Sequence, residues 1–185
     1  MMTELSLHVL DIAQNSIVAK ATQIKIYVSI KTKEDTLSIN IWDNGCGMEK
    51  EVLSKVIDPF YTTRTTRKVG LGIPFFKQSA EITGGSFDIT SEKGVGTTIT
   101  AKYGLSHIDR MPLGDMVSTI HTLITLNQNI DFIYVYEVND ISFEIDTLVL
   151  REILGDIPFH IAEVSNYIKE YLTENTLIVN NGQHY

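Results

Sequence analysis

Two alternating apolar runs limit the kinds of fold that this chain can adopt. Isoleucine or valine occupies every second position of residues 24–30, and leucine or isoleucine does so in residues 37–41. Alternation of this kind predicts strands that bury one face of a sheet. Residues 5–19 precede these runs with apolar side chains at helical spacing, and Ser16 falls on the same apolar face. A helix followed by two strands is therefore expected at the start of the chain.

The rest of the chain continues this mixture of helices and strands. Glycine pairs and prolines mark where the predicted elements end and begin. Strands are predicted at residues 86–91, 97–103, 132–138 and 141–146. Helices are predicted at residues 49–57, 71–83, 147–154 and 158–174, with another that has Pro112 in its first turn.

The charged residues divide the chain into two parts. Residues 1–104 are nearly balanced, whereas residues 105–185 contain 3 Lys/Arg against 12 Asp/Glu. We therefore predict a first domain at 1–104 and an acidic α/β extension at 105–185, which is either a solvated surface or a docking module. The acidic balance argues against nucleic acid as a partner, because phosphates need a basic face.

Composition also suggests a compartment. No apolar run approaches the length of a membrane span, and no charged leader precedes an apolar stretch, so neither an anchor nor a signal peptide is expected. The single cysteine, Cys46, cannot form a disulfide framework. A reducing, cytoplasmic location is the resulting prediction.

Two short polar blocks carry groups suited to a nucleotide. Asp11 and Asn15 are four residues apart in the first predicted helix, so they share a face. An asparagine carbonyl is a hard oxygen ligand for Mg²⁺, and a carboxylate one turn away could orient or deprotonate a nucleophile. Asp43 ends a predicted strand and is followed by Gly45 and Gly47, which allow close approach of a flat ligand. Each block alone is also compatible with a solvated helix face or an ordinary turn.

Two further blocks complete the set. The third block runs from residues 58–64 to residues 69–72. Residues 60–69 are polar, basic and rich in threonine, which predicts a loop, and the glycines after it precede a helix whose N-terminal amides attract phosphate. Such loops often close over a bound nucleotide. Residues 94–98, Gly-Val-Gly-Thr-Thr, are a glycine turn that leads into the last strand of the first part.

The order and spacing of these blocks resemble the GHKL superfamily of DNA gyrase B subunits, ninety-kilodalton heat-shock chaperones, histidine kinases and MutL. Residues 11–15 resemble its N box, 43–47 its G1 box, 58–64 its F box, 70–72 its G2 box and 94–98 its G3 box. The resemblance covers residues 4–104. It implies an α+β fold, a two-layer α/β sandwich of the Bergerat type, that holds ATP and Mg²⁺ between the helical layer and a mobile lid.

The resemblance also assigns roles to individual residues. It makes Asn15 the Mg²⁺ ligand, Asp43 the group that reads the adenine amine, and Asp11 the catalytic carboxylate. The other residues predicted to contact the nucleotide are Gly45, Gly47, Phe60, Thr62, Arg64, Arg67, Lys68, Gly70, Leu71, Gly72 and Thr97.

The chain departs from the hydrolytic members of the superfamily. They usually carry glutamate where this chain has Asp11, which reaches about 1.5 Å less far. The G2 box usually begins with a glycine, and this chain has Lys68 or Val69 at that position. We therefore expect ATP to be held and presented more readily than it is hydrolysed.

Two functions remain open at this point. The first is a free-standing cytoplasmic kinase that resembles the anti-sigma factor kinases and phosphorylates a protein partner. The second is a non-catalytic or slowly hydrolysing switch, in which ATP orders the lid and residues 105–185 bind the partner. A homodimer is plausible by analogy with related kinases.

A separate resemblance concerns His107. The segment Ser-His-Ile-Asp-Arg-Met-Pro-Leu at residues 106–113 is similar to the H box of histidine kinases, although it follows the ATP-binding part and lacks the usual acidic residue after the histidine. His107 is therefore a candidate phosphoacceptor. The alternative is a linker in which Asp109 and Pro112 start a helix.

Overall fold

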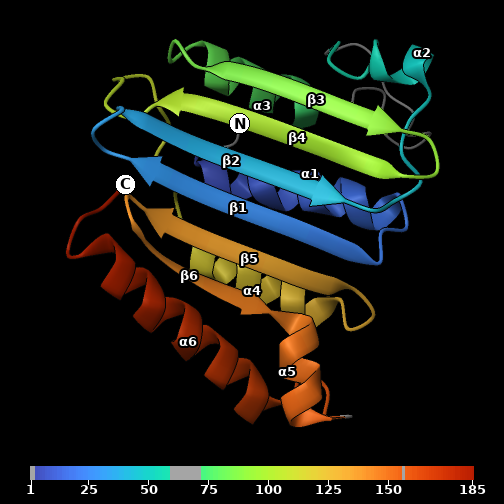
Figure 1. The fold of residues 1–185 in the computed structure, drawn as a ribbon, viewed down its shortest axis with the longest axis vertical. Helices are drawn as coiled ribbons and strands as arrows, with labels where there is room; N and C mark the ends of the chain where they lie inside the picture. Colours follow the sequence, from blue (N-terminus) through green and yellow to red (C-terminus); the bar gives the residue numbers. More distant parts are fainter. Residues whose placement is uncertain (1–2, 59–71, 156) are drawn as a thin grey trace.

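The computed structural model describes residues 3–58, 72–155 and 157–185. These residues form one six-stranded sheet in the order β3-β4-β2-β1-β5-β6 (Figure 1). The strands are β1 (Gln23–Lys31), β2 (Thr36–Asp43), β3 (Ser86–Glu92), β4 (Gly96–Gly104), β5 (Asp131–Val138) and β6 (Ile141–Asp146).

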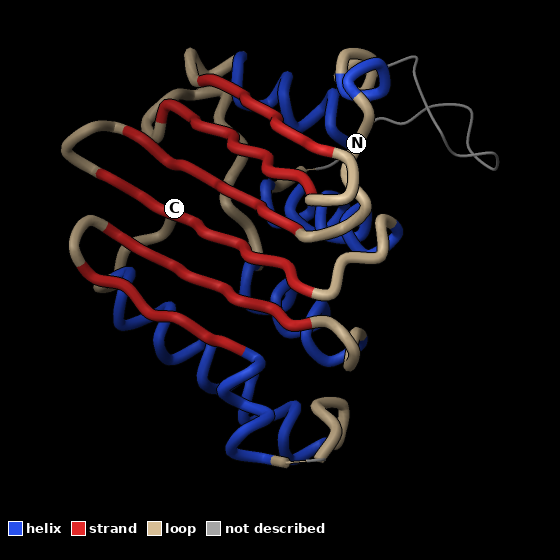
Figure 2. The backbone as a smooth tube through the Cα atoms, turned by 45° about the vertical axis from the view of Figure 1, so that its right-hand side comes forward, coloured by secondary structure: helices blue, strands red, loops and turns tan. Residues whose placement is uncertain are grey.

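The helices that cover the sheet lie on one of its faces. Figures 1 and 2 show α1, α3 and α4 behind the sheet, and no helix of the described residues lies on the central part of the opposite face. In β1 the odd-numbered Lys25 and Tyr27 are exposed on that open face, while Ile24 and Ile26 are buried. The helices are α1 (Leu5–Val18), α2 (Lys50–Leu53), α3 (Gly72–Glu81), α4 (Met116–Leu126), α5 (Thr147–Leu154) and α6 (Ala162–Asn180).

The sheet continues from the first predicted part of the chain into the second. Strand β1 pairs antiparallel with β2, which places Ile26 opposite Ile41, and parallel with β5, which places Ile26 opposite Tyr134. On the open face, Glu137 of β5 accepts hydrogen bonds from Lys31 Nζ at 2.6 Å and Ser29 Oγ at 3.0 Å. The buried apolar residues of both parts belong to one core. The division into a nucleotide-binding part and a docking part stays a prediction about function.

The start of α1 is capped by the chain that follows β4. The N–H groups of Leu5 and Ser6 donate to the carbonyls of Pro112 and Leu113 at 3.0 and 2.9 Å. Leu113 N–H in turn donates to the carbonyl of Tyr185 at 3.2 Å. The first N–H groups of a helix lack partners within it, so these carbonyls satisfy donors that would otherwise be unpaired. The position of α1 therefore depends on residues far along the sequence.

The prediction that Pro112 lies in the first turn of a helix is wrong. Helix α4 begins at Met116, and the Asp115 side chain caps it by accepting from Ser118 N–H at 2.8 Å. Gly114 has a φ of +78°, a left-handed conformation that interrupts a helix. The backbone carbonyl of Pro112 is used by α1 instead.

Two other helix boundaries also differ from prediction. The last helix begins at Ala162, four residues after Pro158, and continues to Asn180. Its later turns are anchored by the buried Leu172 and Val179. The side chains of Thr173 and Asn175 donate to the carbonyls four residues earlier, at 2.7 and 2.8 Å. Helix α2 is shorter than the predicted residues 49–57, and none of its residues is buried to stabilise a longer helix.

The shared sheet predicts that both parts of the chain unfold together. Phe143 of β6 is buried against Tyr134 and Tyr136, so Phe143→Ala should cost about 3 kcal/mol and lower Tm by roughly 6–12 °C. Fluorescence of Trp42, the single tryptophan, reports on β2 three strands away, and its transition should shift by the same amount as circular dichroism. The exposed neighbour Ile141→Ala is the control. An unchanged Trp42 transition would show that the two parts unfold independently.

Candidate functional site

A buried carboxylate stands where β2 ends. Asp43 is the last residue of β2 and is 5% exposed. Its Oδ2 accepts from Ser16 Oγ of α1 at 2.6 Å, and its Oδ1 accepts from Gly45 N–H at 2.8 Å. A carboxylate has roughly four acceptor positions, so two of them remain available to a ligand. The carboxylate is thus held in place and can still accept a hydrogen bond from an amine.

The loop after Asp43 is packed tightly against its neighbours. Cys46 N–H donates to Ala19 O at 2.9 Å, and a Cβ added to Gly45 would lie 2.9 Å from the Cβ of Ala19. Gly47 has a φ of +60°, and a Cβ there would lie 1.9 Å from Glu92 O. A side chain at either glycine would displace the loop, which explains why this block requires glycine at both positions.

Strand β4 brings Thr97 opposite Asp43. The two residues are paired in the antiparallel ladder, and a Cβ on the preceding Gly96 would lie 1.9 Å from Asp43 O. Thr97 Oγ1 is 2.9 Å from Ser91 Oγ, which also accepts from Met48 N–H at 2.9 Å. The first and last glycine blocks therefore meet at one end of the sheet, as their predicted roles require.

The helix α1 brings Asp11 and Asn15 to the start of α3. Both side chains are half-buried. A Cβ added to Gly72 would lie 1.8 Å from Oδ2 of Asp11 and 3.8 Å from Nδ2 of Asn15. Predicted site residues from two blocks, 11–15 and 70–72, are thus close together. Ser16, next to Asn15, binds Asp43. The side-chain oxygen atoms of Asp11 and Asn15 could hold a divalent cation, and the buried carboxylate of Asp43 could bind an amine.

Part of the predicted site lies outside the described residues. The lid residues Phe60, Thr62, Arg64, Arg67, Lys68, Gly70 and Leu71 all belong to this group. Their predicted contacts with nucleotide remain predictions.

The structure does not bring His107 to the other predicted residues. Asp43 is paired with Thr97 at the beginning of β4, whereas His107 follows Gly104 at its end, roughly 23 Å away at ~3.3 Å per residue. His107 lies in a turn and not in a helix, and its Nδ1 accepts from Asp109 N–H at 3.2 Å. The role of His107 as a phosphoacceptor stays a prediction, and it would require His107 to come close to the predicted nucleotide site at the other end of β4.

A buried histidine lies one turn before Asp11. His8 of α1 is 1% exposed and stacks on Phe76 of α3, with ring centroids 5.4 Å apart. Neither ring nitrogen has a hydrogen-bond partner within the described parts of the chain. Burial lowers the pKa of His8 from 6.5 to about 4, because a charged imidazole would lose its hydration there. The neutral ring therefore packs α1 against α3, which carries Gly72.

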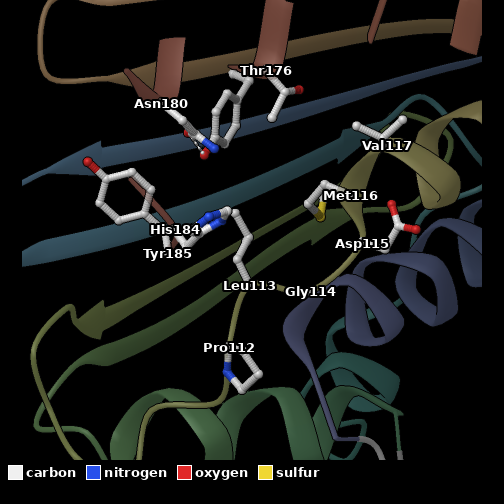
Figure 3. Close-up of a pocket in the computed structure, with 11 residues that line it drawn as sticks. Pro112, Leu113, Gly114, Asp115, Met116, Val117, Thr176, Asn180, His184 and Tyr185 are labelled. Carbon is white, nitrogen blue, oxygen red and sulfur yellow. Dashed lines mark hydrogen bonds between the residues drawn. The ribbon is translucent and has the colours of Figure 1, made fainter. Parts of the chain in front are cut away.

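A separate cavity lies away from these residues. It has a volume of about 300 Å³ and is lined by the 112–117 segment, Tyr136, the end of α6 and Tyr185. Figure 3 shows Leu113 and Met116 on one side of it and Asn180 on the other. None of the sequence-predicted site residues lines this cavity. It marks the place where the C-terminal residues meet the segment that caps α1.

Sequence reasoning did not assign a role to Ser16 or Ser91. Ser16 orients the Asp43 carboxylate, and Ser91 joins the first glycine loop to Thr97. The available signal for Ser16 was a hydroxyl group on the apolar face of a predicted helix, where a buried polar group needs a partner. Ser91 gave no such signal, because it occupies an ordinary strand position.

Comparison with known proteins matches the chain to a family of ATPases. The family model described as histidine kinase-, DNA gyrase B- and HSP90-like ATPase matches residues 3–107. Sporulation kinase B of Bacillus subtilis is 34% identical over 101 residues, which are 54% of this chain and 23% of that protein. The signal transduction histidine-protein kinase AtoS of Escherichia coli is 32% identical over 92 residues, 49% of this chain and 15% of that protein. The chain thus spans less than a quarter of the length of these curated relatives.

Solved structures with a similar fold are more distant in sequence. The N-terminal domain of a DNA repair protein matches with a TM-score of 0.58 and 18% identity, over 78% of this chain and 52% of that one. The Aquifex aeolicus MutL ATPase domain complexed with ADP matches with a TM-score of 0.50 and 13% identity, over 83% of this chain and 70% of that one. At this level of identity the likeness shows the fold alone, and it confirms the predicted α+β sandwich.

The Ser16–Asp43 hydrogen bond leads to a prediction about stability. Ser16→Ala leaves a buried carboxylate with one fewer donor, which should lower the free energy of unfolding by about 1–3 kcal/mol in urea titrations. Ser54→Ala, at an exposed hydroxyl that bonds only its own turn in α2, is the matched control. Equal stability of the two variants would contradict the role given to Ser16.

His8 leads to a prediction about pH. Its folded pKa lies below the ordinary value, so the unfolded chain binds more protons and stability should fall as pH drops from about 6.5 to 4, by up to about 3 kcal/mol. His8→Leu should flatten this part of the curve of unfolding free energy against pH. His160→Leu, at an exposed histidine, is the control. An unchanged acid dependence in His8→Leu would show that other groups cause it.

Proposed function

Because the chain belongs to the family of histidine kinase-, DNA gyrase B- and HSP90-like ATPases, we propose that it binds ATP with Mg²⁺ and transfers the γ-phosphate to a protein partner. The membership confirms the resemblance that the five blocks indicated. The observation that supports the proposal is the convergence of Asp11, Asn15 and Gly72 beside Asp43 and Thr97.

The residues at the sheet end fit an adenine base. Asp43 would accept a hydrogen bond from the exocyclic amine, and its discrimination against bases without that amine would follow from the cost of an unpaired buried carboxylate. Gly45 and Gly47, packed against Ala19 and Glu92, would hold the loop beside the base in one position. Ser16 and Gly45 N–H keep the carboxylate in one orientation before a ligand enters, so little ordering is needed on binding.

The residues between α1 and α3 fit a phosphate chain with its cation. Asn15 would ligate Mg²⁺, and Gly72 begins a helix whose N-terminal amides favour phosphate. Bound ATP·Mg²⁺ supplies the transferable phosphoryl group and neutralises its charge. Asp11 would orient the acceptor hydroxyl or imidazole and take its proton.

Transfer is favoured over hydrolysis by the length of the carboxylate. Asp11 is shorter by about one C–C bond, ~1.5 Å, than the glutamate of hydrolytic relatives, so a water molecule would be held less well. The acceptor is proposed to lie on a separate protein, because His107 stands at the other end of β4. The exposed, unpaired Cys46 is compatible with a cytoplasmic location.

One observation favours an ATP-gated switch as the second candidate. The helix that carries Asp11 and Asn15 is capped by the carbonyls of Pro112 and Leu113. A ligand that shifts α1 would therefore change the contacts of the segment at 105–185. In that case the partner would bind equally well with ATP and with a non-hydrolysable analogue, and no phosphate would be transferred.

The nucleotide site is tested by calorimetric titration with ATP in the presence of Mg²⁺. Asp43→Asn should weaken ATP binding by about 10- to 100-fold, because an amide cannot replace a charged acceptor without leaving a group unpaired. Asn15→Ala should remove most of the Mg²⁺ dependence of the affinity. Asp11→Asn should bind ATP normally but lose transfer to a co-purified partner, measured with labelled nucleotide.

A matched control removes the same charge elsewhere. Asp88→Asn lies on the exposed face of β3 and should leave ATP binding unchanged. If Asp43→Asn and Asp88→Asn bind ATP alike, the proposed site is wrong. If ATP binds but Asp11→Asn transfers phosphate like the unmodified protein, the proposed role of Asp11 is wrong.

A further inference from the structure

Helix α5 exposes an apolar face. Leu148, Val149 and Ile153 are 42%, 51% and 74% exposed, and Thr147 is the buried residue of this helix. Figures 1 and 2 show α5 projecting beyond the β6 edge of the sheet, next to the start of α6. Leu150 and Leu154 pack the other face of this helix against the core, so the exposed apolar side chains lie on the face that its own chain leaves uncovered.

The turn after α5 continues the apolar surface. Ile157 and Ile161 are 47% and 41% exposed, whereas Phe159 between them is buried under the guanidinium of Arg151. We call Leu148, Val149, Ile153, Ile157 and Ile161 the α5 surface. Single exposed apolar residues are ordinary, but five large ones within 14 residues of chain are typical of an interaction site.

Three acidic side chains flank the α5 surface along the chain, where the exposed His160 also lies. Glu144 precedes it, Glu152 lies within it, and Glu163 follows it at the start of α6, and all three are exposed. The surface is therefore apolar with a negative rim.

The nearby basic groups are engaged elsewhere. Arg151 donates to Asp131 Oδ1 at 3.2 Å and to the carbonyls of Gln128 and Ile130 at 2.6 and 3.0 Å. Lys169 lies near enough to Asp115 to help lower the pKa of that carboxyl, after the larger effect of its hydrogen bonds with Ser118. Arg151 is thus not free to neutralise the rim.

We propose that the α5 surface binds an amphipathic helix of a partner protein that presents aliphatic side chains flanked by lysine or arginine. Apolar contact would supply the affinity, and opposite charge at the rim would supply specificity and speed of association. A second copy of this chain is disfavoured as the occupant, because two copies would bring their acidic rims together. The inference deepens the proposed function by naming the surface that would hold the partner.

Model peptides can test the chemistry of this surface. An 18-residue helix of leucine and lysine with one apolar face is the probe, and fluorescence anisotropy with the full chain is the readout. Its leucine–glutamate counterpart and a scrambled leucine–lysine peptide without an apolar face are controls. The amphipathic basic peptide should bind at least tenfold more tightly than either control, and its affinity should fall as salt rises.

Matched variants locate the binding site on the molecule. The double variant Val149→Ser/Ile153→Ser should weaken peptide binding by about tenfold or more, and Glu152→Lys should also weaken it. Leu177→Ser/Ile178→Ser is the control, because these residues are 62% and 66% exposed near the other end of α6. All of these positions are exposed, so the variants should fold, which circular dichroism can verify.

Four results would overturn the inference. The first two are no binding of the amphipathic basic peptide, and binding of the scrambled peptide with the same affinity. The third is a loss of peptide affinity in Leu177→Ser/Ile178→Ser as large as that in Val149→Ser/Ile153→Ser. The fourth is a concentration-dependent dimer that Val149→Ser/Ile153→Ser abolishes. ATP titration of the same samples separates this outcome from the proposed function. Normal ATP binding without peptide binding would reject the α5 surface and leave the nucleotide site standing.

Discussion

The hydrogen bond between the Ser16 hydroxyl and the Asp43 carboxylate connects the two layers of the molecule where its predicted site lies. Asp43 ends β2, and Ser16 follows Asn15 on α1. Because this bond is short and buried, it fixes the helix against the end of the strand and aims a charged acceptor at one place. The glycines around it allow the backbone to approach so closely that a methyl group would not fit. The other parts of the site are arranged around this contact.

The residues after Gly104 support the same arrangement from the other end of α1. Strand β5 pairs with residues 23–30 of β1, and the carbonyls of Pro112 and Leu113 cap the first turn of the helix. Residues 105–185 are thus joined to residues 1–104 through the sheet and through the helix that carries Asp11 and Asn15.

Sequence reasoning predicted the elements whose patterns are local. The alternation of residues 24–30 and the glycine blocks at 43–47 and 94–98 are visible in the chain, and they identified the strands, the family and the fold. The helix boundary near Pro112 was misplaced because Gly114 is left-handed and the Pro112 carbonyl caps α1, and the last helix continues past its predicted end because Val179 is buried in the core. The pairing of β5 with β1 and the role of Ser16 depend on contacts between distant residues, which one sequence does not reveal. The contacts that the lid residues from Phe60 to Leu71 would make with nucleotide stay predictions.

The central claim is that ATP lies between Asp43 and the Asp11–Asn15 face of α1. The most direct measurement is a crystal structure with a non-hydrolysable ATP analogue and Mn²⁺, whose anomalous signal locates the metal. We predict that the adenine amine will lie at Asp43 and the metal at Asn15. Nucleotide in the cavity between Leu113 and Tyr185, or a metal remote from Asn15, would contradict it.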